Sequence, residues 1–118
     1  MKKRRLLIVD DEARITQAFS ELFSGDYEVF TSNDGARAME LIAKHLPELI
    51  VLDWRLRGEV EGKDVLIFVK REFPKIPVYV VTASIHFLDE MKGAGADACL
   101  LKPCSDLRER VLSALPPQ

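Results

Sequence analysis

Apolar residues in this chain occur in short continuous runs. Four runs occupy residues 6–9, 49–52, 78–81 and 98–101, and a fifth, more mixed segment covers residues 27–31. Strands that are buried on both faces of a sheet are continuously apolar, whereas strands with one face in water alternate apolar and polar residues. The runs therefore predict five strands in a sheet that is covered on both faces.

The segments between the strands carry apolar residues at the spacing of an amphipathic helix. These stripes cover residues 15–23, 39–46, 65–69, 88–91 and 107–115. Each stripe is followed within a few residues by a residue that ends helices, namely Gly25, Pro47, Pro74, Gly93 or Pro116. The pattern predicts five helices, of which the fourth has the weakest stripe.

Strand and helix thus alternate five times along the chain. Strict alternation is typical of an α/β protein with a parallel sheet and helices on both faces, joined by right-handed crossovers. The sequence predicts one domain with a five-stranded, doubly wound parallel sheet, a (βα)5 arrangement. A length of 118 residues suits a single core of this kind.

Polar residues follow four of the five strands directly. They are Asp10 and Asp11, then Asp53, then Thr82 and Ala83, and finally Lys102 and Pro103. Because the carboxyl ends of parallel strands share one edge of the sheet, and ligands bind in the crevice outside that edge, we expect these side chains to converge. Three carboxylates, a hydroxyl and an ammonium group at one place indicate a chemical site.

This set of groups favours phosphoryl transfer onto a carboxylate. Two unit charges about 4 Å apart repel by roughly 4 kcal/mol at an effective dielectric of 20, so clustered aspartates favour a hard divalent cation such as Mg²⁺. A carboxylate can attack phosphorus, and cations neutralise the phosphoryl oxygens. Lys102 supplies a mobile positive charge, Thr82 a hydrogen bond, and the small side chain of Ala83 leaves space.

Each of these residues has an ordinary structural explanation when it is considered alone. Asp10 and Asp11 could cap a helix, and Asp53 could be a turn residue. Thr82 could cap the next helix, and Lys102 could extend along the surface into water. Their common position at one edge of the sheet favours the joint interpretation as a site.

Composition excludes some classes of function. A net charge of −2 gives no overall attraction to nucleic acid. The basic start of the chain precedes an apolar run that is too short for a signal peptide or a membrane span. The two cysteines, Cys99 and Cys104, match no metal-binding spacing, and we expect them to be reduced thiols of a cytoplasmic protein.

Five motifs together resemble the receiver domains of response regulators, the two-component signalling family, over essentially the whole chain. They are Ile8-Val9-Asp10-Asp11-Glu12, Asp53 after the third strand, Val81-Thr82-Ala83, Ala94-Gly95-Ala96-Asp97 and Leu101-Lys102-Pro103. The resemblance implies a flavodoxin-like fold with strand order 2-1-3-4-5. It also implies that residues 1–118 form one receiver domain. The C-terminal Pro116-Pro117 could be a natural end or the start of a linker to an output domain.

The resemblance also assigns roles to residues. Asp53 would accept a phosphoryl group from the phosphohistidine of a sensor histidine kinase or a phosphotransfer protein. Asp10, Asp11, Asp53 and the backbone carbonyl of Arg55 would hold Mg²⁺ or Mn²⁺. Thr82, Ala83 and Lys102 would bind the phosphoryl oxygens, and the Lys102–Pro103 bond would be cis. Phosphorylation would then remodel the face of the fourth helix, fifth strand and fifth helix for a downstream protein.

Two features depart from the family pattern. Cys99 stands where the family carries a switch aromatic residue, so the coupling of Thr82 to that aromatic should be absent or changed. The loop after Asp53 lacks the usual proline, is one residue longer before Gly62, which opens the third helix, and carries Arg55 and Arg57. The two arginines could aid binding of the donor, or slow hydrolysis by occupying the approach of water, or pair with Glu59 and Glu61 on the surface. We expect the surface pairing for Arg57.

The function predicted from the sequence is a phosphoacceptor switch, not an enzyme that turns over a separate substrate, with direct contact to neither nucleic acid nor membrane. Two alternatives stay open. One is an aspartate-nucleophile phosphatase, although Glu12 stands where such enzymes carry their second aspartate. The other is a receiver-like interaction module that is not phosphorylated. The kinase, the stimulus and the output are not specified by the sequence.

Overall fold

The computed structural model describes residues 2–118, and within them strands and helices alternate as predicted. The strands are β1 (Arg4–Val9), β2 (Tyr27–Ser32), β3 (Leu49–Asp53), β4 (Val78–Thr82) and β5 (Ala98–Leu101). The helices are α1 (Ala13–Phe23), α2 (Gly35–His45), α3 (Gly62–Glu72), α4 (Leu88–Gly93) and α5 (Leu107–Ala114). A short 3₁₀ turn, η1 (Ile85–Phe87), precedes α4.

The five strands form one sheet in the order β2-β1-β3-β4-β5, and all four neighbouring pairs are parallel. This confirms the doubly wound α/β fold and the strand order. Strand β3 lies in the middle, and β1 lies between β2 and β3, with Leu6 level with both Val29 of β2 and Leu49 of β3. The order reverses direction after β1, so the carboxyl ends of β1 and β3 lie side by side and open a crevice between them.

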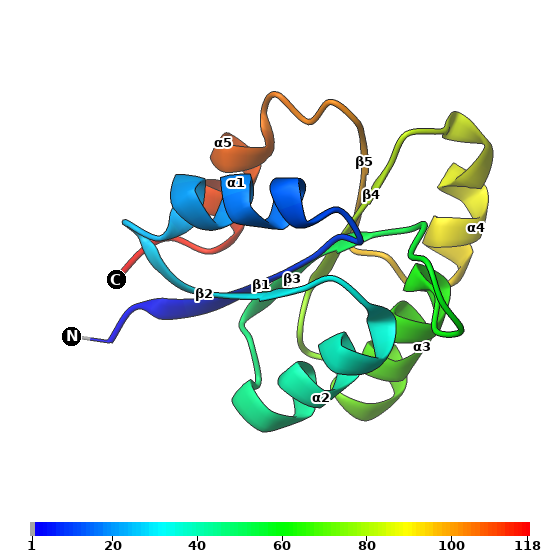
Figure 1. The fold of residues 1–118 in the computed structure, drawn as a ribbon, viewed down its shortest axis with the longest axis horizontal. Helices are drawn as coiled ribbons and strands as arrows, with labels where there is room; N and C mark the ends of the chain where they lie inside the picture. The colour runs from blue at the N-terminus through cyan, green and yellow to red at the C-terminus, as the bar shows by residue number, and fades with distance from the viewer. Residues whose placement is uncertain (1) are drawn as a thin grey trace.

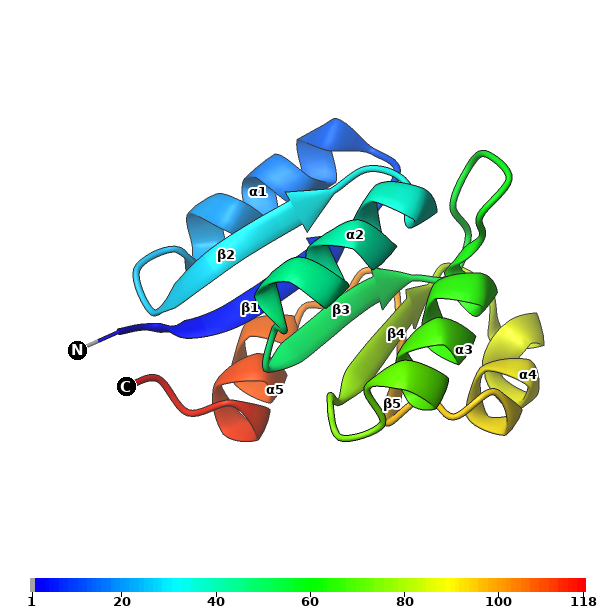
Figure 2. The same ribbon diagram turned by 90° about the horizontal axis from the view of Figure 1, so that it is seen from below.

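Helices cover both faces of the sheet. Helices α1 and α5 lie on one face, and α2, α3 and α4 lie on the other (Figures 1 and 2). Alternate residues of β1 enter the two layers of core: Leu7 and Val9 pack toward α2 and α3, whereas Leu6 and Ile8 pack toward α1 and α5. All four are essentially inaccessible to water. Burial on both faces explains why the strands read as continuous apolar runs.

The start of α3 is packed tightly against the end of β3. A Cβ atom on Gly62 would lie 2.5 Å from the backbone oxygens of both Asp53 and Trp54, so only glycine fits there. The next residues are held by a capping box, in which Glu61 and Asp64 exchange side-chain and backbone hydrogen bonds. Gly62 therefore opens α3, as the sequence predicted, and fixes the course of the chain directly behind Asp53.

The helices of residues 2–118 are all too short, or too polar, to cross a bilayer. Helix α4 is the shortest α-helix of residues 2–118, in agreement with its weak apolar stripe, and the 3₁₀ segment η1 leads directly into it. Gly95 follows it with a φ of +102°, a backbone conformation that favours glycine.

Candidate functional site

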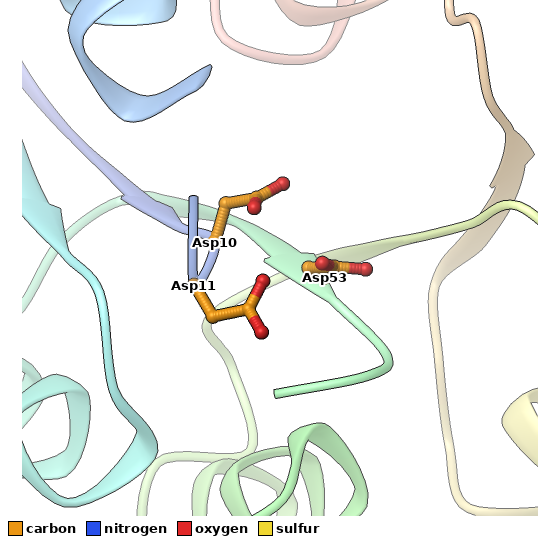
Figure 3. A group of neighbouring side chains, drawn as sticks. All are labelled: Asp10, Asp11 and Asp53. Atoms are coloured by element: carbon orange, nitrogen blue, oxygen red, sulfur yellow. The ribbon is translucent and has the colours of Figure 1, made fainter. Parts of the chain in front are cut away.

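Three aspartates meet at the carboxyl edge of the sheet. Asp10 and Asp11 follow β1, and Asp53 is the last residue of β3 (Figure 3). Each offers a carboxylate oxygen, and these oxygens lie within 4.8 Å of one another. Asp10 and Asp53 are 3% and 7% exposed, and Asp11 is half-buried. The predicted convergence of the three carboxylates is therefore present in the structure.

The backbone around Asp10 is held from two sides. The Asp10 amide donates to the carbonyl of Ser32 at 3.1 Å, and the Asp10 carbonyl accepts from Nδ2 of Asn33 at 2.8 Å. The Asp10 carboxylate also accepts from the amide of Glu12 at 2.9 Å. The sequence interpretation missed Asn33, although it follows a strand at the same edge. Its amide acts on the backbone of Asp10, which no residue pattern reveals.

Lys102 points into the cluster. Its Nζ lies 3.1 Å from Oδ2 of Asp10 and 3.4 Å from Oδ2 of Asp53. Its backbone amide donates to the carbonyl of Thr82 at 2.8 Å, which positions the residue just beyond β5. The Lys102–Pro103 peptide bond is cis. The alternative of a lysine that extends along the surface does not describe this side chain.

The electrostatics of the cluster follow from burial and crowding. Burial raises the pKa of Asp53 to about 6, and the neighbouring charge of Asp10 adds to the effect, while Lys102 opposes it. Burial lowers the pKa of Lys102, but Asp53 and Asp10 outweigh it, so the pKa of Lys102 is raised overall. At neutral pH, Asp53 is therefore ionised and Lys102 charged, with the carboxylate less well stabilised than one in water.

Of the other predicted site residues, Thr82 and Ala83 lie at the carboxyl end of β4, and Cys99 lies within β5. Thr82 ends β4 and is 1% exposed, and its hydroxyl accepts from the amide of Ser84 at 3.2 Å. Ala83 is exposed beside it. Cys99 lies inside β5, half-buried against the core layer under α3 and α4, and burial raises the pKa of its thiol. Within residues 2–118, both cysteines are free thiols.

The loop after Asp53 carries both of its arginines toward partners that the sequence did not reveal. Nε of Arg57 lies 3.2 Å from Oδ2 of Asp11, so the predicted pairing of Arg57 with Glu59 and Glu61 is wrong. The Arg55 guanidinium lies over the ring of Phe87, 5.5 Å from its centre. The partners of Arg55 and Arg57 belong to other segments of the chain, so these contacts depend on how the loop packs in the folded protein.

Trp54 links the loop after Asp53 to the neighbouring strand β4. Its amide donates to the carbonyl of Val81 at 2.9 Å, which extends the pairing of β3 and β4 by one residue beyond Asp53. Its side chain is buried, at 5% exposure. As the one tryptophan of the chain, it is a fluorescent reporter placed directly after the central carboxylate.

A buried aspartate cluster thus lies at the topological switch point of a doubly wound α/β sheet, with a lysine directed into it. The family model for the response regulator receiver domain matches residues 6–113. The chain therefore belongs to the response regulator receiver domain family, and it acts in phosphorelay signal transduction. Receiver domains are phosphoacceptor switches with an acidic pocket that binds Mg²⁺.

Relatives much longer than this chain, and one of similar length, support its membership of the receiver domain family. The chain is 37% identical over 113 residues to the alginate biosynthesis transcriptional regulatory protein AlgB of Pseudomonas putida, covering 93% of this chain and 25% of that protein. It therefore spans about a quarter of the length of this relative. It is 30% identical to sporulation initiation phosphotransferase F of Bacillus subtilis, covering 98% of this chain and 97% of that protein.

Solved structures agree on the fold. The response regulator TrrA of Thermotoga maritima, in complex with Mg²⁺ and beryllofluoride, superposes with a TM-score of 0.84 at 26% identity, covering 95% of this chain and 99% of that one. A CheY-like receiver domain of Methanospirillum hungatei gives a TM-score of 0.87 at 27% identity, covering 95% of this chain and 93% of that one.

Proposed function

We propose that Asp53 is the phosphoacceptor of this receiver domain. The observation that carries the proposal is the position of its carboxylate at the end of the central strand β3, where Lys102 Nζ lies 3.4 Å from Asp53 Oδ2 and 3.1 Å from Asp10 Oδ2. The donor would be the phosphohistidine of a sensor histidine kinase or of a phosphotransfer protein. We expect this exchange in the cytoplasm, where free thiols persist.

The residues present fit a divalent cation. Three carboxylate oxygens within 4.8 Å of one another offer the hard oxygen ligands that Mg²⁺ prefers, and Mn²⁺ accepts the same donors. Asp10, Asp11 and Asp53 would hold the ion, with the backbone carbonyl of Arg55 as a further ligand. When bound, the ion neutralises charge on the phosphoryl group and on the crowded carboxylates.

The chain's own groups account for the transfer step. A carboxylate oxygen of Asp53 attacks the phosphorus, the new O–P bond forms, and the P–N bond of the phosphohistidine breaks, leaving its electron pair on the imidazole nitrogen. Lys102, Thr82 and Ala83 bind the phosphoryl oxygens through an ammonium, a hydroxyl and a backbone amide. Later attack by water returns Asp53 and inorganic phosphate. The domain is a switch without turnover of a separate substrate.

The output would be a change in the face of α4, β5 and α5. Ile85 and Leu101, at the ends of η1 and β5, are 64% and 43% exposed, so this face offers apolar surface to a downstream protein or an output domain. Thr82 would move toward the phosphoryl group. Cys99 is too small to follow as an aromatic residue would, so we expect a damped or differently routed response.

The decisive experiment is incubation with Mg²⁺ and acetyl phosphate, followed by intact-mass measurement and peptide mapping. We expect the gain of one phosphoryl group, mapped to Asp53, and its loss in Asp53→Asn or after chelation of the metal. Phosphate-ester turnover that survives Asp53→Asn and disappears in Asp10→Asn would instead identify a phosphatase. A well-folded protein that takes up no label would identify an interaction module without phosphorylation.

A further inference from the structure

Two cations divide the three carboxylates of the site between them. Lys102 contacts the carboxylates of Asp10 and Asp53. Within residues 2–118, Asp11 is instead paired with Arg57, whose Nε lies 3.2 Å from its Oδ2. The guanidinium therefore occupies one carboxylate oxygen of the group that would ligate a metal ion.

We propose that Arg57 is a tethered counter-ion that competes with the divalent cation for Asp11 and so lowers the metal affinity of the domain. The inference rests on the proposed function, because it assumes that the aspartate cluster binds Mg²⁺. It adds a residue of this chain's own loop that sets how strongly the ion is held.

The two cations of the site differ in how easily they can leave. The Lys102 side chain is 29% exposed and contacts two buried carboxylates, so it stays in place. The Arg57 side chain is 83% exposed, and its partner Asp11 is 14% exposed. Exposed ion pairs are weak and are screened by salt. An incoming ion therefore displaces Arg57 and leaves Lys102 for the phosphoryl group.

The loop holds Arg57 near the cluster without burying it. Leu56 on one side is 6% exposed and belongs to the core. Val60 on the other side packs so closely on the start of α2 that a Cβ atom on Gly35 would lie 2.5 Å from the Val60 carbonyl oxygen. Between these two anchors only residues 57–59 project outward, so Arg57 can release Asp11 by moving its side chain and remain close by.

The test is a calorimetric titration with MgCl₂ of wild type, Arg57→Ala and Arg57→Lys, accompanied by Trp54 fluorescence. We expect Arg57→Ala to bind Mg²⁺ about fivefold more tightly at low ionic strength, which corresponds to roughly 1 kcal/mol, the upper end for an exposed pair. Arg57→Lys should fall between. The gain should shrink in about 1 M salt, where the Debye length is about 3 Å.

Lys63→Ala is the matched control. Lys63 lies at the start of the helix that follows the same loop, is also exposed, and pairs with Glu90 at 3.2 Å, away from the aspartates. Its removal takes away an equal charge and should leave Mg²⁺ affinity nearly unchanged.

Three outcomes separate the inference from the proposed function. Equal or weaker Mg²⁺ binding by Arg57→Ala, with wild type binding normally, overturns the role of Arg57 and leaves the site intact. An equal gain in Lys63→Ala would show that only net charge matters and would also overturn it. Absence of Mg²⁺ binding in wild type, or binding that persists in Asp11→Asn, would contradict the proposed metal site itself.

Discussion

Two lysine–carboxylate contacts lie at opposite ends of the sheet and differ in their charge balance. At the amino end, Oδ2 of Asp97 accepts from Lys70 Nζ at 2.5 Å and from the amide of Val78 at 2.7 Å. Lys70 also donates to the carbonyl of Ile76 at 3.1 Å. One acid meets one base and one amide, and this arrangement ties the start of β4 to the loop that leads into β5.

At the carboxyl end, three acids meet two bases. Lys102 contacts Asp10 and Asp53, Arg57 contacts Asp11, and one negative charge is left over. Burial, and then the neighbouring charge of Asp10, raise the pKa of Asp53 to about 6, whereas the amino-end contact pairs one negative with one positive charge. The Lys70–Asp97 contact therefore holds two segments of the chain together, whereas the contacts of Lys102 with Asp10 and Asp53 form part of a reactive site. The uncompensated charge makes the difference.

Replacement of Asp53 by Asn removes the uncompensated charge at the carboxyl end, and we expect it to have the largest effect on how stability depends on pH. The pKa of Asp53 is raised from an ordinary value of 3.8 to about 6, so the folded state holds this proton more firmly than the unfolded state does. Its contribution to the free energy of unfolding is therefore most favourable below pH 4, falls as pH rises from about 4 to 6, and is level above that. The loss corresponds to about 3 kcal/mol.

Urea unfolding of wild type and Asp53→Asn between pH 4 and 8, in the presence of a chelator, measures this loss. The stability of the variant relative to wild type should increase by about 2 kcal/mol over that range, because part of the full loss has already occurred at pH 4. A difference between the two proteins that stays constant with pH would contradict an uncompensated charge at Asp53.

Substitution of Gly62 tests whether the site edge is as rigidly built as the amino end. A methyl group there would meet the backbone oxygens of Asp53 and Trp54 at 2.5 Å, and backbone atoms cannot yield as side chains do. We expect the free energy of unfolding of Gly62→Ala, measured by chemical denaturation, to be about 2 to 3 kcal/mol lower than that of wild type. We also expect the variant to bind Mg²⁺ more weakly. Gly25→Ala, where no atom lies within 4 Å, is the control. Equal stability of the two variants would refute close packing behind Asp53.

Removal of Asp97 should give the smallest effect and leave phosphorylation intact. Asp97→Ala deprives the buried amide of Val78 of its acceptor, at a cost of about 2 kcal/mol. Asp97→Asn keeps an acceptor and loses mainly the ion pair with Lys70, at a cost of about 0.5 kcal/mol. Thermal unfolding measures both costs, and acetyl phosphate labelling should be unchanged. Loss of labelling in a folded Asp97→Asn protein would break the comparison, because it would give the amino-end contact a part in the site.

The sequence was sufficient to predict the alternation of strands and helices, the parallel sheet and the meeting of Asp10, Asp53 and Lys102. Residues that end parallel strands must gather at one edge, so the position of each along the chain already implies its place in space. The sequence also placed Gly62 at the start of α3, before the structure gave the close contact that requires it.

The partners of the loop side chains were decided only by the tertiary structure. Arg57 has acidic neighbours two and four residues away, yet it pairs with Asp11, 46 residues earlier in the chain. Asn33 reaches the backbone of Asp10 in a similar way. The course of a loop depends on where its ends are anchored, here by Leu56 in the core and Val60 against α2. Such anchoring arises from packing between distant segments, whereas strands and helices carry their own periodic signal.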